Sequence, residues 1–250
     1  TGELLVPYAK KILELQEEVR RNIALKEQTV SGTFFIGASL TTAEVVVPKL
    51  VRDYQRLYPQ VRIYIEVNNS EIILQGLQTG RLHFGIIEAP LTSPSLVIEP
   101  FMTDELICIT SCLYPLLDAP EEHSGIALKE LAHLPLIMRE KGSGTRLVLE
   151  EALARHNIQI EPSRIIVELN STEAIKEMVV NGLGVAVLSR HLIKKELALR
   201  LVKAYPLQPE RLERSFYYAY LPETPPRPTV MAMLNLIEAQ FPCHLDPTEQ

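Results

Sequence analysis

A short segment of glycine and hydroxyl-bearing residues, Ser143-Gly144-Thr145-Arg146, has the composition of an anion-binding turn. It follows an apolar run, residues 134–138, that is typical of a buried strand, and it precedes apolar residues spaced as on one face of a helix. At such a turn backbone N–H groups are unpaired, and the helix dipole adds partial positive charge. Ser143 or Thr145 would cap the helix, and the guanidinium of Arg146 suits a carboxylate, sulfate or phosphate. We interpret the segment as a pocket wall for a small anion, with an ordinary capped loop as the alternative.

Other polar turns also lie between a predicted strand and a predicted helix. Hydroxyl or amide residues follow the predicted strands at residues 33–38, 61–67 and 164–169. Each of these turns opens a segment with helical spacing of apolar residues. Ligands of open α/β sheets bind at the carboxyl ends of parallel strands, where such turns meet. The pattern therefore favours a binding site assembled from several turns.

The elements that must position these turns alternate along the chain. Strand, helix, strand, helix and strand follow one another from residue 33 to residue 87, which indicates parallel strands joined by right-handed crossovers. Residues 96–110 predict two more strands, broken near Thr103-Asp104. The alternation then repeats from residue 128 to residue 188, and a last helix is expected at residues 230–241. Pro48 should bend the first turn of its helix or mark where the regular helix begins.

The composition is that of a globular protein with an acidic balance. The 250 residues are 46% hydrophobic and 22% charged, with a formal net charge of −6. This charge argues against a nucleic-acid surface formed by these residues alone. No apolar run reaches the length needed to span a bilayer. The chain is long enough for two modest lobes.

The first residues predict a dimerisation element. Residues 3–28 have the spacing of one long helix with an apolar seam of threes and fours, which favours a coiled coil over a helix packed on its own domain. The seam residues are Leu5, Tyr8, Ile12, Leu15 and Val19. The chain begins at Thr1-Gly2-Glu3 without an initiating Met or a signal-peptide core, and we expect further sequence upstream.

The cysteines and histidines show no framework for chemistry. Cys108, Cys112 and Cys243 are odd in number and lack Cys-x-x-Cys spacing, which suits buried thiols in a reducing cytoplasm better than a redox centre. The six His residues have no metal-binding spacing, and His156 and His191 lie near predicted helix ends. Neither a Gly-x-Ser-x-Gly elbow nor the Lys of a P-loop is present. We therefore predict no catalytic residues, no metal and no cofactor.

Four sequence blocks resemble the effector-binding part of LysR-type transcriptional regulators. They lie in order along residues 1–240, and they are Pro48-x-Leu50 with Leu57-Tyr58-Pro59-x-Val61, Leu77-x-x-Gly80-x-Leu82-x-x-Gly85-Ile86, Arg139-Glu140-x-Gly142-Ser143-Gly144-Thr145-Arg146, and Val179-x-x-Gly182-x-Gly184-Val185-Ala186-x-Leu188. The third block is similar to regulators of sulfur assimilation and carbon fixation.

The resemblance implies a fold and an organisation. It implies a two-lobed α/β domain of the periplasmic-binding-protein type 2, with two crossover strands and an effector in the cleft between the lobes. Residues 1–30 would be the linker helix, 31–103 and 206–241 lobe I, 104–205 lobe II, and 242–250 a tail. It also implies a dimer or tetramer, and a winged helix-turn-helix upstream of Thr1 that binds DNA.

The resemblance also implies which residues contact the effector. They come from the turns described above, and they are Ser39, Thr41, Thr42, Asn69, Ser70, Ser143, Gly144, Thr145, Arg146, Asn170 and Ser171. Glu88, at the end of its strand, is a more speculative candidate. His83 stands where the family usually has Asp, and Ser189 stands where it often has Pro. A free-standing solute-binding protein with the same fold is the alternative function.

Overall fold

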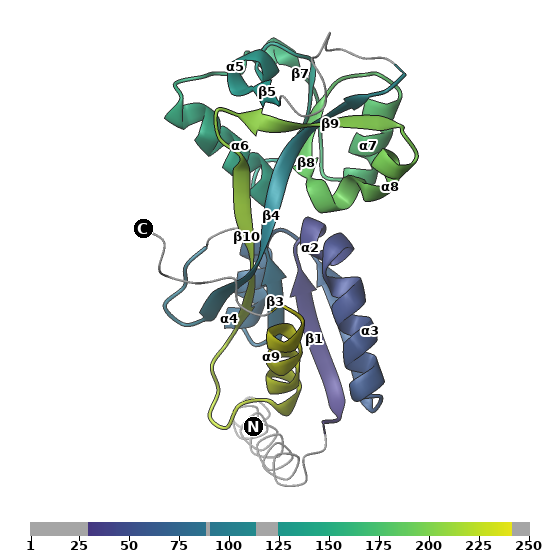
Figure 1. Ribbon diagram of the computed structural model, residues 1–250. Helices are drawn as coiled ribbons and strands as arrows, with labels where there is room; N and C mark the ends of the chain where they lie inside the picture. Colours follow the sequence, from purple (N-terminus) through teal and green to yellow (C-terminus); the bar gives the residue numbers. More distant parts are fainter. Residues whose placement is uncertain (1–29, 89–90, 114–124, 242–250) are drawn as a thin grey trace, which may run out of the picture.

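The computed structural model describes residues 30–88, 91–113 and 125–241. The predicted linker helix with its seam, the tail and Cys243 lie outside the described residues. The described chain forms two lobes, one above the other in Figure 1, and two long strands run from one lobe into the other.

The first lobe is a sheet covered by helices on both faces. Phe34 and Ile36 pack with one set of helices, α3 and α9, while Ile87 packs with α4 on the other side. The elements of this lobe are β1 (Gly32–Ala38), α2 (Leu40–Val45), α3 (Val47–Leu57), β2 (Val61–Val67), α4 (Ser70–Gln78), β3 (Phe84–Ile87) and α9 (Pro228–Gln240). The strands β2, β1 and β3 are parallel, as the alternation of strands and helices predicts.

The second lobe repeats this arrangement. Leu106 and Cys108 share a core with α6, whereas Ile107 and Ile109 share one with α7. Its elements are β5 (Ile126–Ala127), α5 (Leu128–Leu131), β6 (Leu136–Arg139), α6 (Gly144–Arg155), η1 (Pro162–Arg164), β7 (Ile165–Leu169), α7 (Thr172–Val180), β8 (Ala186–Ser189), η2 (Arg190–Ile193), α8 (Lys194–Ala198) and β9 (Val202–Gln208).

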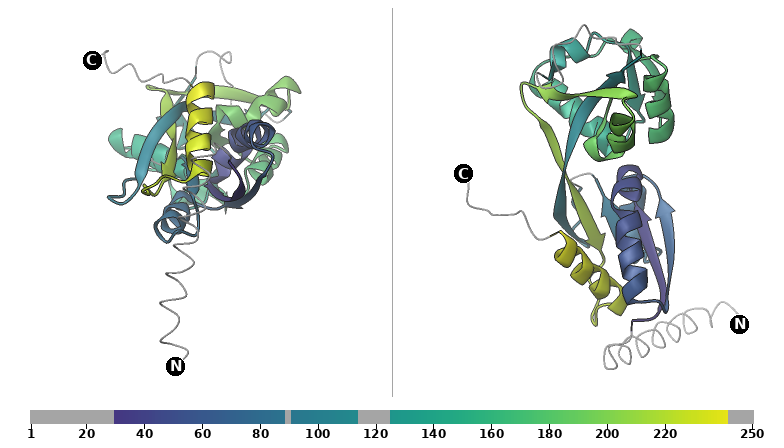
Figure 2. Two further views of the ribbon diagram at one scale, coloured as in Figure 1. Left: turned by 90° about the horizontal axis from the view of Figure 1, so that it is seen from below. Right: turned by 45° about the vertical axis from the view of Figure 1, so that its right-hand side comes forward.

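Two crossover strands join the lobes. β4 (Val97–Ser111) and β10 (Leu212–Tyr220) pair antiparallel with each other, and the sheet order is β2-β1-β3-β10-β4-β9-β5, with β8 also on β4. The right-hand view of Figure 2 shows both strands leaving the first lobe and entering the second. The predicted break near Thr103-Asp104 is wrong, because β4 continues through both residues. Asp104 reads as a turn residue, but its charge is compensated inside the strand pair by Arg214, 110 positions away.

Pro48 lies in the first turn of α3, which confirms the expectation that it marks where the regular helix begins. α2 ends at Val45, and α3 starts at Val47 with Pro48 in its first turn. A proline is tolerated there because the first helical N–H groups have no intrahelical partner. The interruption leaves α2 as a short helix that follows β1 directly.

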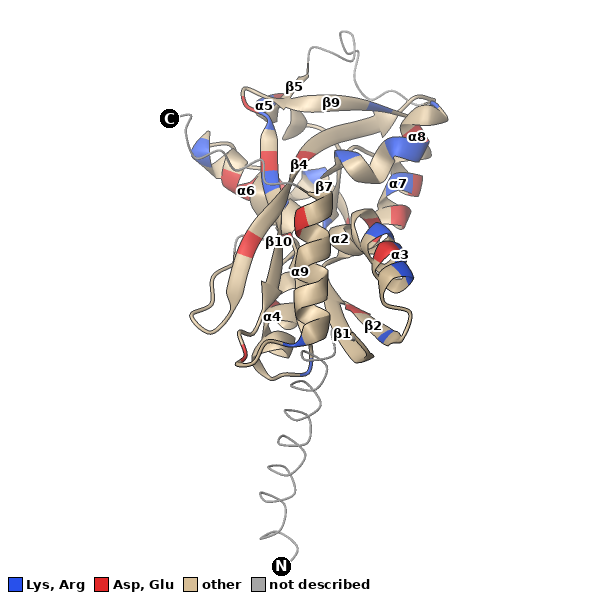
Figure 3. Ribbon diagram, turned by 60° about the horizontal axis from the view of Figure 1, so that its bottom comes forward, with Lys and Arg blue, Asp and Glu red and all other residues tan. Residues whose placement is uncertain are grey.

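Charge is mixed over the surface of the described residues. Figure 3 shows Lys and Arg interspersed with Asp and Glu on α3, α7 and α8. Within the described part of the chain, this view contains no continuous basic stripe of the kind that binds nucleic acid. None of the described helices is both long and apolar enough to cross a bilayer.

Candidate functional site

A small pocket lies where the two lobes face each other. The first lobe contributes Ser70, Glu71 and Leu91, and the second contributes residues 142–144 with the first turns of α6. Its volume is about 130 Å³, well below the roughly 300–1,000 Å³ of pockets for drug-sized ligands. The pocket therefore suits a ligand of only a few heavy atoms.

Ser143 occupies the N-cap position of α6 without capping it. Its backbone has the extended conformation of an N-cap residue, but its side chain accepts no hydrogen bond from the helix. The side chain is 3% exposed, and its Oγ has no hydrogen-bond partner among the described residues. A buried hydroxyl without a partner is costly, so a donor or acceptor from a ligand would stabilise it.

Thr41 repeats this situation in the other lobe, in the first turn of α2. It is fully buried, and its Oγ1 has no partner among the described residues. Its neighbour Thr42 instead donates to the carbonyl of Ile86 at 2.8 Å, and lies 3.1 Å from the hydroxyl of Ser39. Ser39 and Thr42 thus hydrogen bond the start of α2 to the end of β3, whereas the hydroxyl of Thr41 is available to a ligand.

Other predicted ligand residues are used inside the protein. Asn69 caps α4 by accepting from the N–H of Ile72, and Ser171 caps α7 by accepting from the N–H of Ala174. Asn170 is exposed beside Ser171. These caps are the ordinary structural use of Asn and Ser at helix starts. Sequence alone cannot separate such caps from the unpartnered hydroxyls of Thr41 and Ser143.

Arg146 lines the pocket but is held by carboxylates. Its Nε donates to Glu150 at 2.7 Å and its Nη1 donates to Glu168 at 2.6 Å. Burial acts to lower the pKa of Arg146, but the hydrogen bonds to Glu150 and Glu168 outweigh it and raise the pKa. The same contact lowers the pKa of Glu168. The positive charge at this wall is therefore largely compensated within the protein.

A buried ionic cluster joins the lobes beside the pocket. Arg214 of β10 donates to Asp104 of β4 at 2.9 Å and to the hydroxyl of Thr145 at 3.1 Å. Its Nη2 lies 3.4 Å from a carboxylate oxygen of Glu88, close enough for an ion pair, but the geometry is not that of a hydrogen bond. Ser189 completes the cluster by donating to Asp104 at 2.6 Å.

Arg214 and Asp104 were not predicted from the sequence. The available signal was the alternation of Leu212, Arg214 and Phe216, which places a charged residue on the buried face of a strand. A buried charge in such a register requires a partner of opposite charge.

The two lobes also touch at two other places. Glu88 packs so closely on Gly144 that a Cβ there would lie 2.8 Å from Glu88 Cγ and 2.9 Å from its carbonyl oxygen. Only glycine fits this approach. On the other side, Thr172 of α7 is hydrogen bonded to the carboxylate of Glu44 in α2. The structure therefore shows lobes in direct contact around the pocket.

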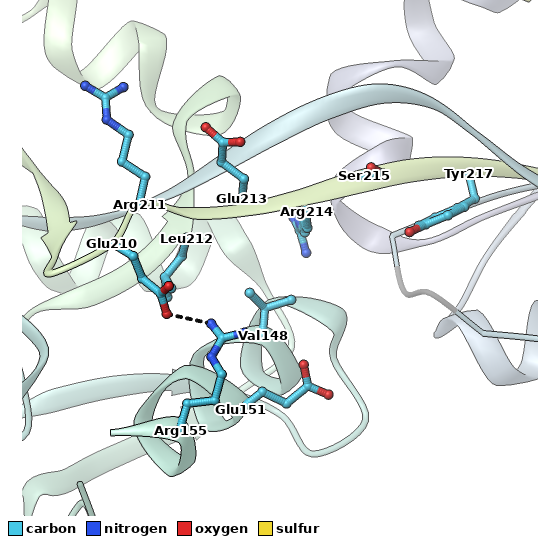
Figure 4. Close-up of a pocket in the computed structure, with 10 residues that line it drawn as sticks. All are labelled: Val148, Glu151, Arg155, Glu210, Arg211, Leu212, Glu213, Arg214, Ser215 and Tyr217. Carbon is cyan, nitrogen blue, oxygen red and sulfur yellow. Dashed lines mark hydrogen bonds and ion pairs between the residues drawn. The ribbon is translucent and has the colours of Figure 1, made fainter. Parts of the chain in front are cut away.

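A larger hollow beside β10 differs from the pocket between the lobes in the side chains that line it. Figure 4 shows it between α6 and residues 210–217, with Arg155 of α6 directed at Glu210. Its volume is about 420 Å³, and Arg155 and Glu210 form an ion pair at 2.8 Å. Glu151 and Glu213 add two more acidic groups. None of the residues lining this hollow has a buried hydroxyl without a partner, in contrast to Ser143 in the pocket between the lobes.

Cys108 is predicted to be unreactive. It is fully buried on β4, and burial raises the pKa of its thiol to about 12. At pH 8 only about one thiol in ten thousand would be ionised, and the thiolate is the reactive form. In a variant with Cys112 and Cys243 replaced by Ser, a chromogenic disulfide reagent should leave native Cys108 unmodified and titrate one thiol after denaturation. Rapid modification of the native variant would contradict this.

Two facing α/β lobes with a small polar pocket between them define a domain that binds a small molecule. The model of the LysR substrate binding domain matches residues 27–242, so the chain belongs to this family. The transcriptional regulator CysL of Bacillus subtilis is 30% identical over 222 residues, covering 89% of this chain and 72% of CysL. A probable RuBisCO transcriptional regulator of Synechocystis is 30% identical over 248 residues, covering 98% of this chain and 71% of that protein.

A solved structure has the same fold. The regulatory domain of Synechocystis CcmR in complex with 2-PG is 28% identical, with a TM-score of 0.73, covering 84% of this chain and 98% of that one. The chain is thus the effector-binding domain of a LysR-type transcriptional regulator, with the predicted two-lobed fold. Both of the relatives described above are regulators, and a free-standing solute-binding protein is not favoured.

Proposed function

We propose that this domain senses a small acid, bound between the lobes against the N-terminus of α6. The observation that carries the proposal is the pair of buried hydroxyls, Thr41 and Ser143, that have no partner among the described residues. They belong to opposite lobes, and Ser143 adjoins Gly144, where the two lobes touch. A helix of 12 residues directs its first N–H groups and its positive dipole end toward the same place. The acid bound by CcmR, 2-PG, is one probe of this class.

The ranking of ligand residues follows from their other contacts. Ser143, Ser70 and the N–H group of Gly144, which line the pocket, would contact the ligand directly, and Thr41 would reach it from α2 in the first lobe. Arg146 would contribute less, because its guanidinium is already shared by two carboxylates. Ser39 and Thr42 would hold α2 in place, and Asn69, Asn170 and Ser171 would shape the rim.

The remaining parts of the regulator are also proposed. Residues 31–103 would form most of lobe I and residues 104–205 most of lobe II. The expected return to lobe I at residue 206 falls inside β9, which packs in the second lobe, so lobe I would instead be completed by the end of β10 and by α9. Residues 3–28 would pair two cytoplasmic subunits as a linker helix, within a dimer or tetramer. Closing of the lobes on the effector would change the spacing of two DNA-binding domains.

Removing either unpartnered hydroxyl should weaken effector binding. A thermal-shift screen of small acids, including 2-PG, identifies a ligand, because binding to the native state raises its stability by about 2.7 kcal/mol at a hundredfold excess over Kd. Calorimetry should then show that Ser143→Ala and Thr41→Val each lose about 1–3 kcal/mol, or roughly tenfold to hundredfold in affinity.

Ser163→Ala is the matched control, since its side chain is exposed in η1 and distant in sequence from every pocket residue. Its affinity should equal that of the parent protein. Parental affinity in both pocket variants, with folding intact, would show that the hydroxyls are not ligand contacts.

A further inference from the structure

Glu88 places a buried carboxylate beside the proposed site, packed against Gly144 of the pocket wall. It is 2% exposed, and its Oε2 accepts no hydrogen bond from any described residue. It follows β3, whose Ile86 carbonyl accepts from Ser39 and Thr42 at the start of α2. On its other side it packs on Gly144 at the start of α6. Glu88 therefore lies between the end of β3, which is bonded to the start of α2, and the start of α6.

Glu88 shares its cation with a second buried carboxylate, Asp104. Arg214 is the cation beside it, but that guanidinium donates its shortest ionic hydrogen bond to Asp104, at 2.9 Å, and reaches Glu88 only at 3.4 Å. Two buried carboxylates thus share one cation. An anion that carries no O–H group cannot donate a hydrogen bond to the Glu88 carboxylate. In a buried site the two negative charges would then repel each other, and binding of this anion would be unfavourable.

We propose that the effector is an acid that carries its own O–H donor, and that Glu88 selects it by accepting this hydrogen bond. This inference rests on the proposed function and names the ligand class of the same site. The acid group would take the N–H groups of α6 and the hydroxyls of Thr41 and Ser143. The O–H group would donate to Oε2 of Glu88.

The selection follows from hydrogen-bond complementarity. A carboxylate is only an acceptor, so it stabilises a hydroxy acid or a protonated oxyanion, and it disfavours a shape-matched ion without a hydrogen. Hydrogen phosphate and sulfate have nearly the same tetrahedral shape, but at neutral pH only phosphate carries O–H. Glycolate and acetate form a second pair, in which only glycolate carries a hydroxyl. A buried polar group that is left unpaired by the wrong ligand gives strong discrimination.

The experiment is calorimetric titration of the whole chain with these four ions at neutral pH and constant ionic strength. The protein should bind phosphate at least about a hundredfold more tightly than sulfate, or glycolate at least about a hundredfold more tightly than acetate. Preference in the first pair alone identifies a protonated oxyanion, and preference in the second alone identifies a hydroxy acid. Glu88→Gln should reduce the preference to about threefold or less, because its amide can also donate to sulfate or acetate.

Glu213→Gln is the charge-matched control, since Glu213 is exposed and one residue from Arg214 on β10. It should keep the parental preference. Equal binding of both members of each pair by the parent protein overturns the inference while leaving an acid site intact, and this result needs no variant to fold. A preference that survives in folded Glu88→Gln also overturns it. If none of the four ions binds, the proposed acid site fails and the inference fails with it.

Discussion

Replacing Arg214 with Met should lower the free energy of unfolding by about 3–5 kcal/mol, because the change leaves two buried carboxylates without their cation. The Arg214 side chain is 2% exposed, and its partners Asp104 and Glu88 are 0% and 3% exposed. The hydrophobic part of the side chain is retained in Met, so the loss reports mainly on charge. Urea unfolding followed by circular dichroism measures it.

Two further variants separate the charge effect from general damage. Arg190→Met breaks an ion pair with Glu105, but the Arg190 side chain is 54% exposed, and exposed pairs contribute only about 0–1 kcal/mol. Adding Asp104→Asn and Glu88→Gln to Arg214→Met should recover most of the lost stability, since no uncompensated charge remains. A loss below about 1 kcal/mol in Arg214→Met would show that the cluster does not hold the crossover strands together.

Gly144→Val should abolish effector binding, with a loss of at least about a hundredfold in affinity. Its Cβ would lie 2.9 Å from the carbonyl oxygen of Glu88, a backbone atom that cannot turn away. Either α6 or the first lobe must move, and this displaces Ser143, Glu88 and the helix N–H groups together. Overpacking should also cost about 1–3 kcal/mol of stability.

The matched control lies on the same helix. Ala154→Val also introduces a valine into α6, but on its exposed side, where only helix propensity, a few tenths of a kcal/mol, is affected. It should bind the effector as the parent does. Tight binding by Gly144→Val, together with an unchanged small-angle scattering profile, would mean that the contact between Glu88 and Gly144 is not part of the site.

The order of strands and helices could be predicted because each element carries its own period. The alternation in Val61–Val67 and the helical spacing before Leu57 are local patterns, and the structure has a strand and a helix there. The course of β4 could not be predicted in the same way. Asp104 reads as a turn residue until Arg214 is known to face it, and that pairing is set by the tertiary fold.

The site was predictable at the level of turns but not of individual contacts. Ser143 and Ser171 both precede a helix and are indistinguishable in sequence, yet only Ser171 accepts a hydrogen bond from its helix. The difference comes from the neighbours that each side chain meets in the fold.

The structure shows two contacts of His83, the residue that stands where the family usually has Asp. The N–H of Phe35 donates to its Nδ1 at 3.4 Å, and the guanidinium of Arg227 lies 3.2 Å from its Nε2. A neutral imidazole has only one acceptor nitrogen, so with Nδ1 accepting from Phe35 the contact with Arg227 is not a hydrogen bond donated by the guanidinium.

The position of β10 decides when the first lobe can be completed during synthesis. β10 lies between β3 and β4, and α9 covers Phe34 and Ile36, so this lobe is built from both ends of the described chain. Translation delivers β1, β2 and β3 early, with the edge of β3 unpaired and with the part of one face that α9 covers still exposed. The strands β5 to β9 of the second lobe all emerge before β10. The strands of the second lobe can therefore pair during synthesis while the first lobe is still incomplete. The first lobe is completed only by the last 30 residues of the described chain, Leu212 to Phe241.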